Sequence, residues 1–143
     1  MLVKDAMTRQ VECVGPDDSI QTAAGKMRDM DVGPMPVCGT DGKLAGMLTD
    51  RDIAVRAVAA GHAPAACKVR DVMTPGVEYC FDDQDTAEAS RLMQDKQIRR
   101  VLVLDRGKKL VGILSLGDLA VNASKGQAGD TLKQVSEPAK PRR

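Results

Sequence analysis

The chain repeats itself once, with a period of 66 residues. Residues 3–55 align with residues 69–121 without a gap, and 18 of the 53 aligned positions are identical. Average residue usage would give about three identities by chance. Two copies are too few for a solenoid, which needs about three repeats or more. The repeat therefore predicts a closed pair of similar halves related by a pseudo-twofold axis.

Both copies contain the same order of expected elements. A short helical lead-in is followed by a strand, a helix behind acidic residues, two strands joined by turn-forming residues, and a last helix. In the first copy the lead-in is 3–7, the strands are Gln10 to Val14, 35–38 and 43–48, and the helices start at Asp17/Asp18 and after Thr49. In the second copy the lead-in is 69–73, the strands are Gly76 to Cys80, 101–104 and 109–114, and the helices start at Asp83 and after Ser115. The order predicts an α+β (α/β) fold built from two β-α-β-β-α repeats.

The same order sets the expected domain boundaries. Residues 1–60 form the first repeat, 61–68 a linker, 69–123 the second repeat, and 124–143 a flexible basic tail. The tail has five basic and two acidic residues, while the remaining 123 residues have 16 basic and 18 acidic ones, which leaves the whole chain at +1. A folded part near neutrality argues against a general phosphate-backbone binder, so no nucleic-acid partner is expected.

The composition excludes several other protein classes. Hydrophobic residues make up 43% and charged residues 29%, which is an ordinary globular balance. The longest apolar runs have only a few residues, whereas a helix that spans a bilayer needs about 20. The first ten residues contain three charges and no apolar stretch of the signal type. We therefore expect a cytoplasmic protein that has no membrane partner.

Catalytic and metal-binding patterns are missing from the sequence. The single histidine, His62, lies in the Gly/Pro/Ala-rich linker, and no P-loop or G-x-G-x-x-G motif is present. The four cysteines contain no C-x-x-C pair, which argues against a zinc site. The expected protein is therefore not an enzyme, and it requires neither a metal nor a cofactor.

The cysteines allow two interpretations. Cys13, Cys38, Cys67 and Cys80 can all remain reduced thiols, which is the expectation for a cytosolic protein. Alternatively, Cys13 and Cys38 form a single disulfide, because both lie at the ends of expected strands in the same half. Geometry decides between the two interpretations.

One motif recurs where the third strand of each copy meets the last helix. Gly46–Asp52 and Gly112–Asp118 both contain a glycine, then a hydroxyl residue, and then an aspartate three residues further on. The hydroxyl of Thr49 or Ser115 can cap the helix, and a carboxylate can accept both hydrogen bonds of a ribose diol. The glycine would allow a ligand to approach the backbone closely. A plain capping box without any ligand would give the same spacing.

Together these motifs resemble the CBS (cystathionine-β-synthase-type) domain, in two tandem copies that cover residues 3 to about 123. The residues that carry the resemblance are Asp5–Thr8, Val32–Val37 and Gly46–Ile53 in the first copy, and Asp71–Thr74, Ile98–Val101 and Gly112–Asp118 in the second.

The resemblance implies a pair with two clefts between its halves that binds adenosine-containing ligands (AMP, ADP, ATP, NAD(H) or S-adenosylmethionine) as regulatory effectors. It also implies flat homodimers and a sensor rather than a catalyst, which would act on an unknown regulated protein. Asp52 and Asp118 would hold ribose hydroxyls. The remaining ligand-binding candidates are Thr49 and Ser115 beside ribose or phosphate, Thr8, Thr74, Val11 and Val77 around adenine, Pro36 in the strand entry, and Arg51, Arg99 and Arg100 as phosphate partners.

The second copy departs from the first at two places. Leu102 stands where the first copy has Pro36, and Leu116-Gly117 replaces Asp50-Arg51. We therefore expect the two sites to differ in affinity. The alternative functions are a ligand-free structural or protein-interaction module, and a redox-responsive stress protein that uses Cys13 and Cys38.

Overall fold

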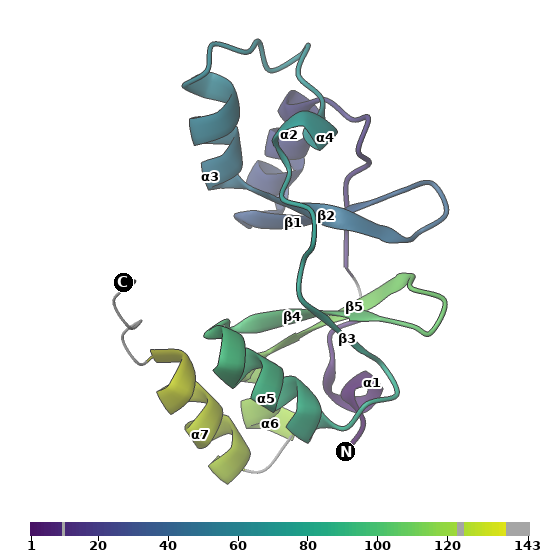
Figure 1. Ribbon diagram of the computed structural model, residues 1–143, viewed down its shortest axis with the longest axis vertical. Coiled ribbons are helices and arrows are strands. Elements are labelled where there is room, and N and C mark those ends of the chain that lie inside the picture. The colour runs from purple at the N-terminus through teal and green to yellow at the C-terminus, as the bar shows by residue number, and fades with distance from the viewer. Residues whose placement is uncertain (10, 123–124, 137–143) are drawn as a thin grey trace. The chain divides into compact units, whose positions relative to one another are not determined.

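The computed structural model describes residues 1–9, 11–122 and 125–136, and its contacts divide the chain into two compact units (Figure 1). Unit 1 consists of Met1–Val11, Glu78–Gly107 and Val111–Arg143, and unit 2 consists of Glu12–Val77 and Lys108–Leu110. Each unit mixes helices with a small sheet, so the expected α+β fold is confirmed.

Unit 2 places helices and an antiparallel hairpin around one core. Its elements are α2 (Ile20–Met30), β1 (Pro34–Cys38), β2 (Leu44–Thr49), α3 (Asp50–Asp52), the π-helix η1 (Ile53–Val58) and α4 (Val69–Val72). The expected turn at 39–42 joins β1 to β2, and Gly42 there adopts φ 80°, a conformation that glycine accepts without steric cost.

Unit 1 has similar elements, with a third strand and one additional helix. Its elements are α1 (Val3–Ala6), β3 (Tyr79–Phe81), α5 (Thr86–Lys96), β4 (Arg100–Leu104), β5 (Leu110–Ser115, whose first residue falls in unit 2), α6 (Leu116–Asn122) and α7 (Lys125–Ser136). The sheet order is β3-β4-β5, and β3 pairs with β4 in parallel.

The long helices begin later than the acidic residues suggested. Ser19 caps α2 by accepting a hydrogen bond from Thr22 N, whereas the Asp18 carboxylate accepts from Gly15 N at 2.8 Å and closes a turn before the helix. Asp85 caps α5 through Ala87 N, while Asp83 pairs with Arg106. The predicted starts at Asp17/Asp18 and Asp83 are therefore wrong by a few residues, because these carboxylates serve other partners.

The first strand of each copy is shorter than expected. Of the strand predicted from Gln10 to Val14, only Val14 makes a bridge, in parallel to Val37, and Gln10 lies outside the described residues. The strand predicted from Gly76 to Cys80 begins at Tyr79, because Gly76 adopts φ 71°, which a strand does not contain.

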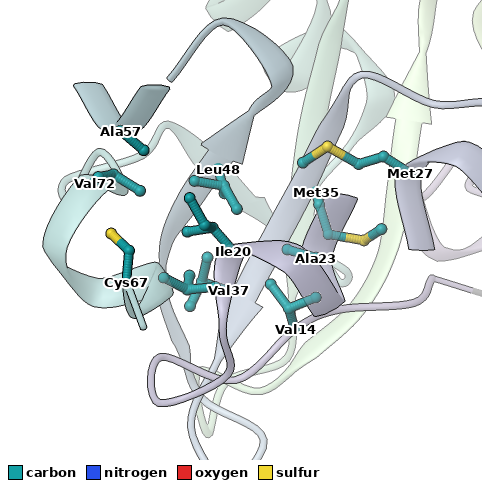
Figure 2. Close-up of a cluster of buried hydrophobic side chains, with 11 residues drawn as sticks. Val14, Ile20, Ala23, Met27, Met35, Val37, Leu48, Ala57, Cys67 and Val72 are labelled. Atoms are coloured by element: carbon teal, nitrogen blue, oxygen red, sulfur yellow. The ribbon is translucent and has the colours of Figure 1, made fainter. Parts of the chain in front are cut away.

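Each unit has its own apolar core of aliphatic and sulfur-containing side chains. In unit 2 the side chains of Ile20 and Met27 from α2 pack with Val37 from β1 and Leu48 from β2 (Figure 2). In unit 1 the buried set includes Met93 at the position equivalent to Met27. Burying a Leu, Ile or Met side chain contributes about 1.5–3 kcal/mol, so these clusters stabilise each unit on its own.

The lead-in helices do not pack with the repeats that follow them. Helix α1 begins the first repeat in sequence, but Val3 and Ala6 are buried in the core of unit 1 with the second repeat. Helix α4 likewise contributes Val69 and Val72 to the core of unit 2. The sequence repeats and the packed units therefore differ by an exchange of their first elements.

Two glycines make this exchange possible. A Cβ on Gly112 would lie 2.8 Å from the carbonyl oxygen of Thr8, and one on Gly46 would lie 2.8 Å from that of Thr74. The expected role of these glycines, close approach of a ligand, is wrong, because the main chain of the lead-in segment occupies that space.

The expected flexible tail is wrong over residues 125–136, which form α7. In Figure 1 this helix lies along α5 and α6, and its Thr131 is fully buried while Val135 packs against the core of unit 1. Thr131 and Val135 are four residues apart on the same face of the helix, and a threonine at one of these places does not mark an apolar face in the sequence. Residues 123–124 and 137–143 lie outside the described residues.

Within residues 1–9, 11–122 and 125–136, no helix is long and apolar enough to cross a membrane.

Candidate functional site

In unit 1 the repeated motif forms a reciprocal cap at the start of α6. Ser115 N donates to Asp118 Oδ2 at 2.9 Å, and Asp118 N donates to Ser115 Oγ at 3.1 Å. This is the capping box that the spacing allows. It occupies one carboxylate oxygen of Asp118 and leaves the other for a further partner.

That further partner in unit 1 is a hydroxyl from the lead-in segment. Thr8 Oγ1 donates to Asp118 Oδ1 at 3.5 Å, and Thr8 also pairs with Ile113 through two backbone hydrogen bonds of 2.8 and 3.0 Å. Thr8 is exposed and Asp118 is half-buried. The structure thus brings together three of the predicted site residues, Thr8, Ser115 and Asp118.

The backbone of one predicted cation, Arg99, is linked to this site. The carbonyl oxygen of Arg99 accepts from Leu116 N at 3.0 Å, which holds Arg99 beside the first residue of α6, and Arg100 begins β4. Both arginine side chains are exposed, while Val11 is half-buried.

The site in unit 2 repeats the cap. Thr49 N donates to Asp52 Oδ2 at 3.0 Å, and Asp52 N donates to Thr49 Oγ1 at the same distance. Thr74 pairs with Met47 through backbone hydrogen bonds of 2.8 and 2.9 Å, as Thr8 pairs with Ile113 in unit 1. In each unit, therefore, a threonine of the exchanged lead-in pairs with the strand that runs into the capped helix.

The second oxygen of the Asp52 carboxylate has a different partner. Arg56 Nε lies 3.8 Å from Asp52 Oδ1, and the same guanidinium donates to Val72 O at 3.5 Å. The equivalent residue in unit 1 is Asn122, whose amide donates to the main-chain oxygen of Asp118. Sequence reasoning missed Arg56, although its i,i+4 spacing from Asp52 is a recognisable signal for an ion pair on a helix.

The remaining predicted residues of unit 2 lie at different depths. Arg51 and Thr74 are exposed and Val77 is half-buried. Pro36 is buried in β1, where its carbonyl oxygen accepts from Val14 N at 3.0 Å. Pro36 thus supports the sheet behind the site.

The four cysteines are free thiols in this structure. Cys38 is buried, Cys13 is half-buried, and a side-chain hydrogen bond joins the two thiols. Among the described residues, no group of three or more His, Cys, Asp or Glu side chains is arranged to hold a metal ion.

A family model of the CBS domain matches the chain twice, at residues 3–58 and 69–124. The chain belongs to the CBS-domain family. Both matches contain the glycine-hydroxyl-aspartate motif, so the two capped aspartates lie at equivalent places in the two CBS repeats.

Relatives of similar length support the assignment. The chain is 44% identical over 135 residues to the CBS domain-containing protein YhcV of Bacillus subtilis, and the alignment covers 94% of each chain. It is 33% identical over 135 residues to hypoxic response protein 1 of Mycobacterium tuberculosis, again with 94% of each chain covered.

Solved structures of CBS pairs share the fold. A crystal structure of hypoxic response protein I with two coordinated zinc ions superimposes with a TM-score of 0.75 at 35% identity, covering 87% of this chain and all of that one. The CBS pair of protein MJ0100, in complex with 5′-methylthioadenosine and S-adenosylmethionine, superimposes with a TM-score of 0.69 at 26% identity, covering 85% and 98%. The chain is therefore a CBS pair, a regulatory type of module.

Proposed function

We propose that this CBS pair is a non-catalytic sensor that binds adenosine-containing ligands, AMP, ADP, ATP, NAD(H) or S-adenosylmethionine, at Asp118 in unit 1 and at Asp52 in unit 2. The observation that carries the proposal is the carboxylate of Asp118. One of its oxygens is held by the cap, and the other accepts from the hydroxyl of Thr8 over a long 3.5 Å contact.

This arrangement suits a ribose diol. The cap fixes the direction of the carboxylate, and a fixed acceptor loses less conformational freedom when a ligand binds. A ribose hydroxyl can replace or share the weak Thr8 contact, because a carboxylate oxygen accepts more than one hydrogen bond. Thr8 would then lie beside the sugar, and Val11 would border the base.

The exposed cations supply partners for a phosphate. The backbone of Arg99 is hydrogen-bonded to the first residue of α6 and Arg100 follows it, while Arg51 and Arg56 lie on either side of Asp52 in the chain. A guanidinium offers a planar fork that matches phosphate oxygens. The ligand of the MJ0100 pair supports the adenosine class, since that complex contains 5′-methylthioadenosine and S-adenosylmethionine.

The direct test is a ligand-induced rise in thermal stability. AMP, ATP, NADH and S-adenosylmethionine are each added to the purified full chain, and its unfolding temperature is measured. A ligand that binds only the folded protein stabilises it by about 2.7 kcal/mol at 100 times its dissociation constant. The absence of any shift with all four ligands would contradict the proposal.

Asp118→Asn and Asp52→Asn identify the site. An asparagine keeps one oxygen for the cap but replaces the other with an amide donor, which cannot accept from a ribose hydroxyl. We expect each variant to fold and to lose binding at its own site. The matched control is Asp50→Asn, because Asp50 is an exposed neighbour outside the proposed ribose contact.

We further propose that the protein forms homodimers. Val55 on η1 and Val121 on α6 occupy equivalent positions in the two repeats and are 52% and 81% exposed. A second copy of the chain could bury these exposed apolar side chains, and burial of apolar surface favours association. Light scattering of the wild-type protein and of a Val55→Lys/Val121→Lys double variant tests this, and we expect a dimer and a monomer, respectively. A monomeric wild-type protein would contradict it.

We expect the protein to act in the cytoplasm, where adenine nucleotides are abundant. We also expect a regulated partner that binds one ligand state of the protein in preference to the other. Such a readout requires two conformational states with different ligand affinities.

A further inference from the structure

Two thiols in unit 2 lie on adjacent backbone segments. Val14 bridges Val37 in parallel, with Val14 N donating to Pro36 O at 3.0 Å and Cys38 N donating to Val14 O at 2.9 Å. Cys13 immediately precedes this bridge and Cys38 immediately follows it. Because side chains alternate along extended backbone, the thiols share one face while the two valines point into the core.

The contact between the thiols is direct. A side-chain hydrogen bond joins Cys38 to Cys13, and both thiols are in the reduced form. The backbone on the Cys13 side is anchored, since Lys26 Nζ donates to Cys13 O at 3.2 Å. The two cysteines are diagonal neighbours across this bridge rather than directly opposite, so the sulfur atoms have to move toward each other before a bond can form.

We propose that Cys13 and Cys38 are a redox modification site, at which the two thiols exchange with a low-molecular-weight disulfide to form one intramolecular disulfide. This disulfide would tie the segment before α2 to the end of β1. The proposal does not depend on ligand binding at Asp52 or Asp118.

The second repeat shows that the fold does not need thiols at these places. The positions equivalent to Cys13 and Cys38 are Tyr79 and Leu104, on the paired strands β3 and β4. The same backbone arrangement is therefore stable with an aromatic and an aliphatic side chain. Since only one repeat has thiols at these positions, their presence is better explained by thiol reactivity than by core packing.

Exposure assigns the order of the two steps. Cys13 is half-buried and can meet a small disulfide, whereas Cys38 is only 5% exposed. Burial, followed by the neighbouring Cys13 and Asp41, raises the pKa of the Cys38 thiol to about 12. Cys38 therefore remains protonated at neutral pH, and Cys13 is the thiol that reacts first.

The exchange balances in atoms and electrons. The Cys13 thiolate attacks one sulfur of the external disulfide, forms a mixed disulfide, and releases one small thiol. Cys38 then loses its proton, attacks the Cys13 sulfur, and releases the second small thiol. The two protein thiols are oxidised to one disulfide, and the external disulfide is reduced to two thiols.

The test is disulfide mapping of the folded full-length protein. The protein is equilibrated with oxidised and reduced glutathione at several ratios, quenched with acid, alkylated and digested with trypsin. Cleavage after Arg9, Lys26, Arg28 and Lys43 places the two cysteines in separate peptides, 10–26 and 29–43. We expect an intact mass lower by two hydrogen atoms, two alkylated thiols instead of four, and a crosslink between these two peptides.

Single variants trap the intermediate. In Cys38→Ala the resolving thiol is absent, so Cys13 should retain one glutathione. In Cys13→Ala the buried Cys38 should remain unmodified while the protein is folded. Cys67→Ala and Cys80→Ala are the controls, and each should still form the crosslink. If a variant fails to fold, the wild-type peptide map alone decides the question.

Four alkylated thiols after equilibration of folded protein with oxidised glutathione alone would overturn the proposal. A crosslink that uses Cys67 or Cys80 would overturn it as well.

Discussion

Thr8 and Asp118 are hydrogen-bonded at 3.5 Å, although 110 residues separate them in the sequence. The contact exists because the lead-in segment of the first repeat packs in unit 1, next to the last helix of the second repeat. Each adenosine site that we propose is therefore assembled from both sequence repeats. A fragment containing residues 69–123 alone would lack Thr8.

Replacing Thr8 should weaken ligand binding without unfolding the protein. Thr8→Val removes the hydroxyl and keeps the backbone bridge to Ile113, because that bridge uses only main-chain atoms. Losing one hydrogen bond costs about 1 kcal/mol, or roughly a fivefold rise in the dissociation constant. Isothermal titration with AMP and with S-adenosylmethionine measures the change.

Thr8→Ser is the matched control, since it keeps the hydroxyl and should bind within about twofold of the wild type. Equal binding by Thr8→Val and the wild type would exclude Thr8 from the site.

Gly112, which lies beside this lead-in segment, should not accept a side chain without a loss of stability. A Cβ on Gly112 would lie 2.8 Å from Thr8 O, and a Met7 side-chain atom is also in its way. Gly112→Ala should therefore destabilise the protein by about 1–3 kcal/mol, the usual cost of overpacking. Urea unfolding monitored by circular dichroism measures this free energy.

Gly25→Ala is the contrasting variant. Gly25 lies inside α2, and a Cβ there would meet nothing within 4 Å. Alanine is favoured over glycine in a helix interior, so this change should stabilise the protein by about 0.5–1 kcal/mol. Equal effects of the two substitutions would show that the close approach at Gly112 has no energetic consequence.

Local features of the fold could be predicted from the sequence. The hairpin turn at 39–42 and the caps at Thr49 and Ser115 depend on residues within a few positions of one another, so residue type and spacing are sufficient. The internal repeat also predicted that the two halves contain equivalent elements.

Features that depend on distant packing could not be predicted. The exchange of α1 and α4 between the units leaves no periodic pattern, and it reversed the interpretation of Gly46 and Gly112 as ligand-facing residues. Helix α7 was missed because few of its side chains are apolar, and Thr131 is buried through hydrogen bonds instead.

The buried hydroxyls between α5 and α7 should contribute to stability. Thr131 and Ser90 are 0% and 2% exposed and are hydrogen-bonded to each other, and Gln94 Nε2 donates to both at 3.2 Å. Thr131→Val leaves buried polar groups without this partner and should cost about 1–3 kcal/mol. Chemical denaturation of the full chain measures the loss.

A double-mutant cycle isolates this contact. The first repeat has alanine, Ala24, at the position of Ser90. Ser90→Ala combined with Thr131→Val should therefore cost less than the sum of the two single changes. Lys133→Ala, an exposed change on the same helix, should stay within about 0.5 kcal/mol of the wild type. Strict additivity of the two buried changes would contradict the coupling.

The Asp83–Arg106 pair should make stability depend on acid pH. Hydrogen bonds from Arg106 hold the pKa of the Asp83 carboxyl below its usual value of 3.8, and the guanidinium also lies 4.2 Å from the centre of the Phe81 ring. Because the folded-state pKa is depressed, this contribution is fully present above the unfolded-state value. It is lost as the pH falls through the folded-state pKa.

Asp83→Asn should therefore reduce stability slightly at pH 7, and the difference between the two proteins should shrink as the pH falls through the folded-state pKa of Asp83. Unfolding curves measured from pH 7 down into the acid range test the sign. A variant that loses more stability at low pH than at neutral pH would contradict the assignment. High salt should shrink the difference at pH 7, because the pair is exposed.

The two proposed sites differ in the residue that follows the aspartate by one helical turn. Arg56 lies 3.8 Å from the Asp52 carboxylate, while Asn122 at the equivalent place in unit 1 donates to the main-chain oxygens of Ala6 and Asp118. A cation beside the ribose-binding carboxylate attracts a phosphate, but it also competes with an uncharged ligand for the same oxygen. Arg56→Gln should therefore weaken binding of AMP in unit 2 and strengthen binding of 5′-methylthioadenosine. An exposed charge contributes about 1 kcal/mol or less, so each dissociation constant should change by up to roughly fivefold.

Titrations in the Asp118→Asn background, which leaves only the site in unit 2, measure both ligands. If Arg56→Gln weakened the binding of both ligands equally, Arg56 would stabilise the fold of unit 2 and would not determine ligand specificity.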